Sequence, residues 1–227
     1  MPNIPFLNPS ILKQLELPVP SRDTTPQYLS PLDLSQPYTP SLEVQAYRRL
    51  YGLDQLECEH WQGFIDMPLF KLHVQVFAPK VTPIKGTVWI LHGYLEHSGI
   101  YQPIFHELLA QGFSVLTYDL PGHGLSNGSP ANIQNFDHYQ QVLHAVYATV
   151  KGAPQLSGPW LGIGQSTGGA IWMHHLLDFA QKRKNPFVQR VLLLSPLIRP
   201  AKSAWWHNPV GLGIIRRIKR QVPRHFR

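Results

Sequence analysis

The sequence predicts an α/β fold built around a mostly parallel, doubly wound sheet. Short, nearly continuous apolar runs are typical of strands that are buried on both faces of such a sheet. These runs alternate with longer segments whose apolar residues recur at helical spacing. A glycine-rich turn also joins one of the runs, at residues 160–163, directly to a helix. Right-handed crossovers follow from this order, and ligands are expected beyond the carboxyl ends of the strands.

Residues 1–56 of the 227-residue chain predict a proline-rich arm followed by a short helix. Nine prolines occur within residues 1–40 among Ser, Thr and Gln, a composition that cannot form a packed core. Apolar residues at helical spacing over 42–53 predict the helix, with Ser41 as its amino-terminal cap. The main domain is therefore expected to begin near residue 57.

A hairpin is predicted to open the main domain. Residues 72–76 alternate apolar and polar side chains, as in a half-buried strand, and a turn is predicted at residues 66–68. Buried parallel strands are then predicted at 87–91, 113–118, 160–163 and 191–194. The helices between them are predicted at 100–109, at 136–150 and from Ser166 to about Lys184.

Residues 160–169, which read W-L-G-I-G-Q-S-T-G-G, place Ser166 where an apolar strand turns into a helix. Gly164 and Gly168 lie two residues before and after the serine, so they keep side chains away from a tight turn. The pattern predicts a nucleophile elbow, which exposes the serine hydroxyl at the carboxyl end of the strand. For the short motif alone, a Ser/Gly-rich loop without function is the alternative.

Two further motifs follow the two preceding parallel strands: residues 92–98 read H-G-Y-L-E-H-S, and residues 119–126 read D-L-P-G-H-G-L-S. Together with the elbow, they resemble the α/β-hydrolase superfamily, and within it the monoacylglycerol lipase and lysophospholipase group of serine aminopeptidase S33-type hydrolases. The resemblance covers roughly residues 57–200. It implies the α/β-hydrolase fold and a serine hydrolase, an esterase of lipid metabolism that needs no cofactor and acts on monoacylglycerols or lysophospholipids.

By this resemblance, Ser166 is the nucleophile, and the backbone N–H groups of Tyr94 and Thr167 form the oxyanion hole. Two preorganised N–H donors facing the developing oxyanion lower the barrier to ester cleavage by several kcal/mol. Asp119 and His123 precede the serine, whereas the order in this fold is Ser, acid, His, so neither is assigned to catalysis.

The group usually has histidine and methionine where this chain has Gln165 and Thr167. Both substitutions keep the backbone donor and leave the substrate subclass open.

The base and the carboxylate that would activate the serine are not predicted within this chain. The acidic residue that follows Ser166 is Asp178, twelve positions along the same predicted helix, or about 18 Å along its axis. Four histidines follow the serine without ending a later strand: His174, His175, His207 and His225. The sequence is therefore expected to be the first part of a longer hydrolase, with little or no activity of its own.

On this basis, residues 57–200 are predicted to be the N-terminal part of the hydrolase domain, with a sheet that is incomplete on its C-terminal side. Residues 201–227 are predicted to begin a basic, amphipathic cap region. The positive charge lies in the residues after Asp178, since all 13 acidic residues occur up to that position and 12 of the 20 Lys and Arg residues follow it. Residues 205–227 predict a peripheral membrane contact, with a solvated cap helix as the alternative.

Other classes of protein fit the sequence poorly. The basic tail comes without a recognisable nucleic-acid-binding fold, and the 12 histidines lack the spacing of a metal site. The single cysteine, Cys58, and the absence of a recognisable export signal in residues 1–20 predict a cytoplasmic protein. The expected partner is a small lipid or ester substrate. The alternative function is a non-catalytic lipid- or partner-binding protein that retains the hydrolase half-fold.

Overall fold

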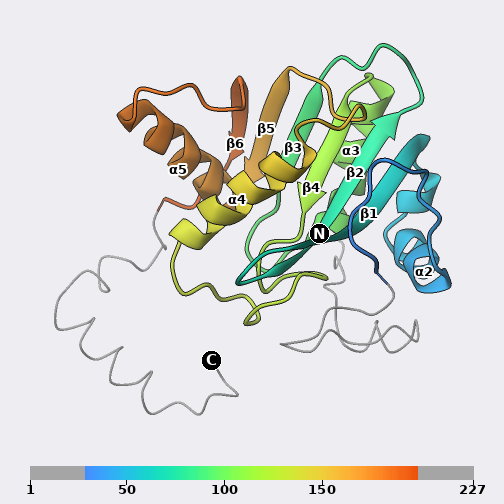
Figure 1. The fold of residues 1–227 in the computed structure, drawn as a ribbon, viewed down its shortest axis with the longest axis horizontal. Coiled ribbons are helices and arrows are strands. Elements are labelled where there is room, and N and C mark those ends of the chain that lie inside the picture. Colours follow the sequence, from blue (N-terminus) through green and yellow to red (C-terminus); the bar gives the residue numbers. More distant parts are fainter. Residues whose placement is uncertain (1–28, 199–227) are drawn as a thin grey trace. The chain divides into compact units, whose positions relative to one another are not determined.

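A computed structural model describes residues 29–198, which contain a six-stranded sheet in the order β1-β2-β4-β3-β5-β6 (Figure 1). The strands are β1 (Cys58–Asp66), β2 (Lys71–Pro79), β3 (Thr87–Leu91), β4 (Ser114–Tyr118), β5 (Trp160–Gln165) and β6 (Arg190–Leu194). The hairpin β1–β2 is antiparallel, and β2 also pairs antiparallel with β4. The strands β4, β3, β5 and β6 run parallel to one another. The predicted α/β fold with a mostly parallel sheet is confirmed.

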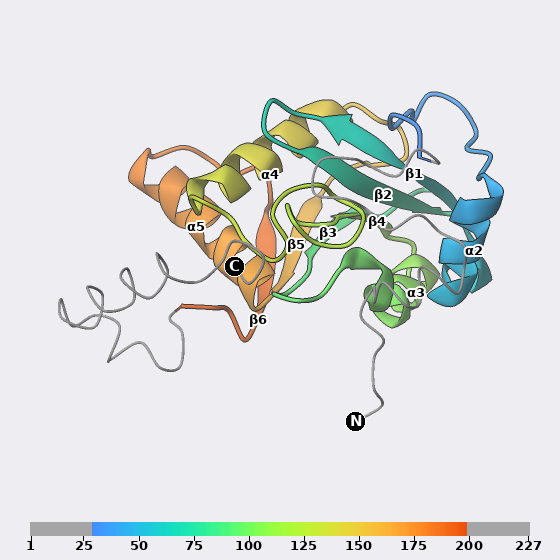
Figure 2. The ribbon, with the colours of Figure 1, turned by 90° about the horizontal axis from the view of Figure 1, so that it is seen from below.

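Helices cover both faces of the sheet. They are α2 (Leu42–Leu50), α3 (Gln102–Ala110), α4 (Asp137–Val150) and α5 (Thr167–Gln181), with single 3-10 turns η1 (Leu53–Gln55) and η2 (Ser98–Tyr101). Seen along the sheet, α4 and α5 lie on one side and α2 and α3 on the other (Figure 2). Each face therefore has a hydrophobic core of its own.

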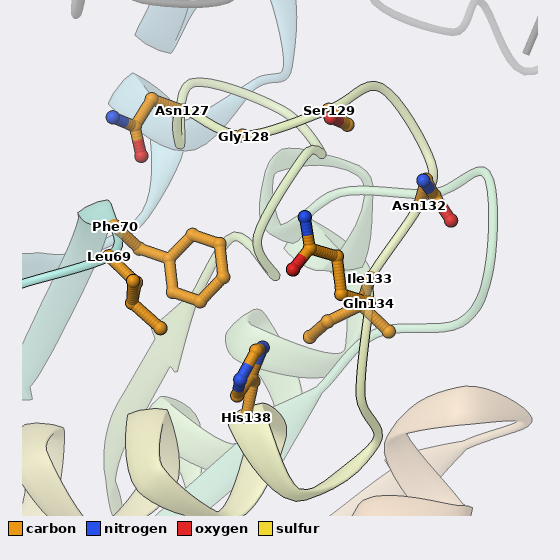
Figure 3. A pocket seen from close by; sticks show the side chains of 9 residues that line it. All are labelled: Leu69, Phe70, Asn127, Gly128, Ser129, Asn132, Ile133, Gln134 and His138. Atoms are coloured by element: carbon orange, nitrogen blue, oxygen red, sulfur yellow. The ribbon is translucent and has the colours of Figure 1, made fainter.

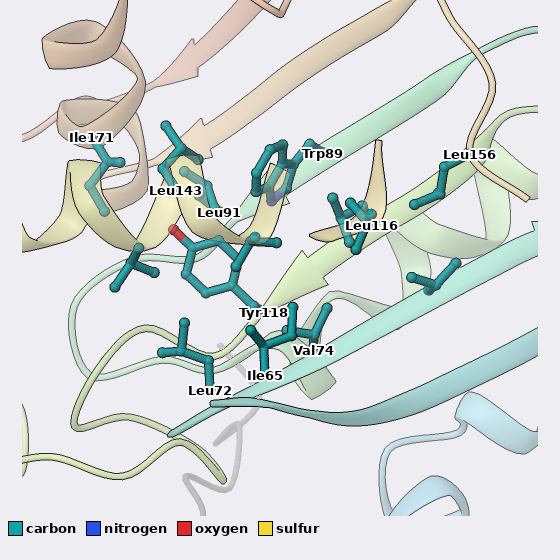
Figure 4. Packing of buried hydrophobic residues seen from close by; sticks show 14 of the residues in the cluster. Ile65, Leu72, Val74, Trp89, Leu91, Leu116, Tyr118, Leu143, Leu156 and Ile171 are labelled. Atoms are coloured by element: carbon teal, nitrogen blue, oxygen red, sulfur yellow. The ribbon is translucent and has the colours of Figure 1, made fainter. Parts of the chain in front are cut away.

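The strand β3 supplies both cores, because successive side chains of a strand point to opposite faces. Trp89 and Leu91 pack into the core beneath α4 and α5 (Figure 4), and Val88 and Ile90 pack into the core beneath α2 and α3. All four side chains are almost completely buried. Burial of such a side chain contributes about 1.5–3 kcal/mol, so the apolar run that predicts this strand also anchors the two helical layers.

The prediction of a half-buried strand at residues 72–76 is wrong in one respect. The polar residues His73 and Gln75 of β2 are fully buried, like their apolar neighbours. The Nε2 atom of Gln75 donates to the Ser98 hydroxyl oxygen at 2.8 Å, and the His73 ring lies edge-on to Tyr47 of α2. Because α2 and η2 cover this face, the polar side of the strand is internal, and its hydrogen bonds are made by the Gln75 amide and by the Nδ1 atom of His73.

The end of one helix and the burial of one strand also differ from the predictions. The helix α2 begins at the predicted cap, where the Ser41 hydroxyl accepts from the Val44 N–H at 3.4 Å, but it ends at Leu50. Gly52 then adopts a left-handed conformation with φ of 67° and starts η1. Strand β6 was predicted to be buried on both faces, yet Leu192 is 55% exposed, and within the described residues β6 pairs with β5 alone.

No helix within residues 29–198 is both long enough and apolar enough to cross a membrane. The predictions for residues 1–28 of the arm and for residues 201–227, including the proposed membrane contact at 205–227, lie outside the described residues.

Candidate active site

Ser166 lies in the turn between β5 and α5 with a φ of 47° and a ψ of −107°. This conformation is strained for any residue with a side chain, and such strain is concentrated at functional sites. Hydrogen bonds on both sides hold it, since the Ser166 N–H donates to the Leu194 carbonyl at 2.9 Å and the Ala170 N–H donates to the Ser166 carbonyl at 3.0 Å. The predicted strand, tight turn and helix are therefore present around this serine.

The two glycines that flank the serine allow β5, α5 and β3 to approach closely. A Cβ atom on Gly164 would lie 2.5 Å from the Gly168 carbonyl oxygen. A Cβ atom on Gly168 would meet the carbonyl oxygen of Leu91 at the end of β3. The Gly168 N–H donates to the His92 carbonyl at 3.1 Å, so the first turn of α5 is bonded to the loop after β3.

The strain at Ser166 gives a prediction about stability. Glycine adopts a positive φ without a steric cost, so Ser166→Gly is expected to stabilise the chain by about 1 kcal/mol. For a domain of this size that corresponds to roughly 2–4 °C in the thermal unfolding midpoint. Ser166→Ala keeps the side-chain strain and is the control, with no comparable gain. Equal thermal unfolding midpoints for Ser166→Gly and Ser166→Ala would contradict the inferred backbone strain at this position.

The loop after β3 is oriented by His92, which is fully buried. The Leu120 N–H donates to His92 Nε2 at 2.9 Å, so the ring proton is on Nδ1 and is donated to the Gly93 carbonyl at 2.8 Å. Burial lowers the pKa of His92 to about 3, which keeps the ring neutral. Because C=O and N–H point in opposite directions across a trans peptide, this bond also fixes the direction of the Tyr94 N–H.

Ser166, Tyr94 and Thr167, the predicted site residues, lie on adjoining backbone segments. A Cβ atom on Gly93, the residue before Tyr94, would lie 3.4 Å from the Cβ atom of Ser166. Thr167 is the first residue of α5, where N–H groups have no acceptor within the helix. The partial positive charge of a helix amino terminus adds a field that favours an anion at this point.

Asp119, which sequence analysis excluded from catalysis, is a buried anchor for three segments. Its Oδ1 accepts from the N–H and hydroxyl of Ser98 at 2.8 and 2.7 Å. Its Oδ2 accepts from the Leu125 N–H at 2.8 Å and from His73 Nδ1 at 2.9 Å. Burial alone would raise the pKa of Asp119, but its hydrogen bond and electrostatic interaction with His73 outweigh it and hold that pKa well below its usual value.

His123 packs within the wall of the site. Its Nδ1 lies 2.9 Å from the Pro121 carbonyl oxygen, and its ring contacts Tyr94 edge-on at 5.8 Å between centroids. Burial lowers the pKa of His123. These contacts are consistent with a packing role for His123, which sequence analysis leaves out of catalysis.

A pocket of about 330 Å³ lies between the β1–β2 turn and the loop that follows β4. Figure 3 shows the rings of Phe70 and His138 on its wall with the Gln134 side chain facing them. The Tyr94 hydroxyl donates to the Ala131 carbonyl at 2.9 Å, so the loop that lines this pocket is bonded to the loop after β3. The lining residues of the described chain include no Asp, Glu, Lys or Arg.

Comparison with known families gives a match to the serine aminopeptidase S33 family over residues 82–225. The chain belongs to this family. It is 33% identical over 128 residues to human monoglyceride lipase, covering 56% of this chain and 40% of that protein. It is 30% identical over 112 residues to caffeoylshikimate esterase from Arabidopsis thaliana, covering 48% of this chain and 34% of the esterase.

The fold is also found among solved α/β-hydrolases. The mouse alpha/beta hydrolase domain-containing protein 10 superposes with a TM-score of 0.52 at 20% identity, covering 70% of this chain and 58% of that structure. The chain spans about half or less of the length of the curated relatives it matches.

Within residues 29–198, no histidine is hydrogen-bonded to the Ser166 hydroxyl. Asp178 faces solvent and pairs with Lys182 at 2.8 Å, and His174 lies 3.7 Å from Asp137. His175 is fully buried among aromatic rings, where burial lowers its pKa to about 4. These contacts agree with the expectation that none of the three side chains serves the elbow.

Two side chains that connect segments of the candidate site, Glu96 and His73, are not predicted from the sequence. The motif at residues 92–98 contains Glu96 but assigns it no role, although its carboxylate accepts hydrogen bonds from Gly93 and Tyr101. His73 was assigned to a polar, exposed face. A buried partner for Asp119 has no local signal in the sequence, because 46 positions separate the two residues.

Proposed function

We propose that the chain carries the nucleophile half of a carboxylic ester hydrolase, with Ser166 as the nucleophile. The Ser166 hydroxyl attacks the ester carbonyl and gives its proton to a general base, which in this proposal lies outside residues 29–198. The resulting oxyanion accepts hydrogen bonds from the backbone N–H groups of Tyr94 and Thr167. The C–O bond then breaks, the alcohol leaves with the proton from the base, and water hydrolyses the acyl-enzyme.

The observation that carries this proposal is the strained serine facing the Gly93–Tyr94 backbone. Ser166 has a φ of 47° between a strand and a helix. The Gly93 backbone approaches so closely that a Cβ atom on Gly93 would touch the Cβ atom of Ser166. A structural turn has no need of a side chain in this conformation, since glycine would fit with less strain. The presence of serine at this strained position therefore supports a catalytic role for its hydroxyl group.

For the substrate, we propose a monoacylglycerol or a lysophospholipid. Support comes from the relatives, one of which is named a monoglyceride lipase. The pocket whose lining loop is bonded to Tyr94 supports an uncharged alcohol or acyl group, because its wall combines the apolar side chains of Leu69, Phe70 and Ile133 with amide side chains.

A fluorophosphonate probe tests the proposed nucleophile. The product of the intact gene is expected to be labelled, and Ser166→Ala is expected to remove the label while leaving the circular dichroism spectrum unchanged. Ser157→Ala is the matched control, since Ser157 precedes the amino-terminal end of β5, whereas Ser166 follows its carboxyl end. A well-folded protein without labelling would reject the hydrolase and favour the non-catalytic lipid- or partner-binding alternative.

A further inference from the structure

Glu96 uses both of its carboxylate oxygens to connect two segments of the site. Its Oε2 accepts from the Gly93 N–H at 2.9 Å and from the Tyr101 hydroxyl at 2.6 Å. Its Oε1 accepts from Gln165 Nε2 at 3.3 Å. Gly93 directly precedes Tyr94, and Gln165 directly precedes Ser166, so a single side chain reaches both sides of the reacting centre.

This bridge lies where the backbone pairing between the two strands stops. The strands β3 and β5 pair in parallel up to Leu91 and Gly164. Beyond that pair, the two segments diverge, one into the loop after β3 and the other into the turn at Ser166. The side-chain hydrogen bond between Glu96 and Gln165 links these two segments beyond the last backbone pair of the two strands.

Tyr101 keeps the carboxylate in place. Burial raises the pKa of Tyr101 well above its usual value, and its hydrogen bond to Glu96 acts in the same direction. The phenol is therefore a permanent donor. Since its hydroxyl also lies 3.3 Å from the Gly93 N–H, Gly93, Glu96 and Tyr101 form a compact group.

A carboxylate beside a developing oxyanion would oppose the reaction if it acted through charge alone. The contribution of Glu96 must then come from geometry, because an oxyanion hole is effective only when its donors are held in place before the reaction. We propose that Glu96 is a positioning residue that sets the separation between the Tyr94 and Thr167 donors. This inference rests on the proposed ester hydrolysis at Ser166.

Steady-state kinetics of p-nitrophenyl butyrate hydrolysis by the intact gene product provide the first test. Glu96→Ala is expected to lower kcat by about 10- to 100-fold with KM within about twofold, since donors aligned for the transition state do not bind the ground state. Glu96→Gln is expected to stay within about threefold of the wild type. Its amide oxygen still accepts from Gly93 and Tyr101, and Gln165 can turn its own amide to match.

Glu107→Ala is the matched control, an exposed glutamate on α3 whose removal is expected to change neither constant. A loss in Glu96→Ala confined to KM, or a Glu96→Gln variant as impaired as Glu96→Ala, would overturn the positioning role.

Amide hydrogen exchange separates this inference from the proposed function. The Gly93 amide is expected to exchange at least tenfold faster in Glu96→Ala than in the wild type, whether or not the preparation hydrolyses esters. If the wild type shows neither hydrolysis nor labelling, the proposed function fails, and the exchange rate still decides whether Glu96 holds the loop. Unchanged exchange at Gly93 would reject the bridge itself.

Discussion

Replacing Asp119 with alanine is expected to cause a large loss of stability, about 3–5 kcal/mol, because it leaves buried donors without an acceptor. The Ser98 N–H, the Leu125 N–H and His73 Nδ1 all lose their partner at once. A loss of this size lowers the thermal midpoint of a domain of this length by roughly 10 °C. Differential scanning calorimetry at neutral pH measures the change, with Asp54→Ala, an exposed carboxylate on η1, as the control.

The same carboxylate predicts a dependence of stability on pH. The fold holds the pKa of Asp119 below its ordinary value of 3.8, so its contribution is complete above that value and is lost as the pH falls toward the lower, folded-state pKa. Asp119→Asn keeps one acceptor oxygen and is expected to lose less stability than the alanine variant. Its stability should also fall less steeply below pH 4, and a slope equal to that of the wild type would reject the assignment of an ionised carboxylate.

Gly168→Ala is expected to disrupt the elbow, because the added methyl group would meet backbone atoms that cannot rotate away. Its Cβ atom would meet the Leu91 carbonyl oxygen and would lie 2.8 Å from the His92 carbonyl oxygen. Separating α5 from β3 costs about 1–3 kcal/mol, as overpacking does in other cores. A displacement of about 1 Å between the two proposed oxyanion donors is expected to slow fluorophosphonate labelling by about 100-fold.

Gly152→Ala is the control for this second variant. A Cβ atom at Gly152 meets nothing within 4 Å, so the change is expected to leave both the midpoint and the labelling rate unaltered. If Gly168→Ala were as harmless as Gly152→Ala, the close contact between α5 and β3 would be wrong.

Patterns in the sequence predicted the parallel strands well, because strands buried on both faces are continuous apolar runs. The run at 87–91 coincides with β3, and the tight turn after residue 163 coincides with the elbow at Ser166. The prediction failed where tertiary contacts override local patterns. Residues 72–76 alternate like a half-buried strand, but α2 covers the polar side.

The candidate site was predictable where its residues belong to a motif and less so where they act across the fold. Ser166, Tyr94 and Thr167 stay predictions as to their roles, although the structure places their backbones on adjoining segments. The link from Glu96 to Gln165 spans 69 positions, and nothing local in either segment indicates the other. Such contacts depend on the order of strands in the sheet, which periodicity alone does not determine.

The neutral imidazole of His92 has a consequence for how acid would inactivate the molecule. Its ring takes up a second proton only near pH 3, and only then would it cease to accept from Leu120. In the mildly acidic range, the His92 hydrogen bonds to the Gly93 carbonyl and the Leu120 N–H are therefore kept. An acidic limb in a rate profile at pH 5 to 7 would consequently report the proposed proton acceptor of Ser166 and not a disruption of the Gly93–Tyr94 loop.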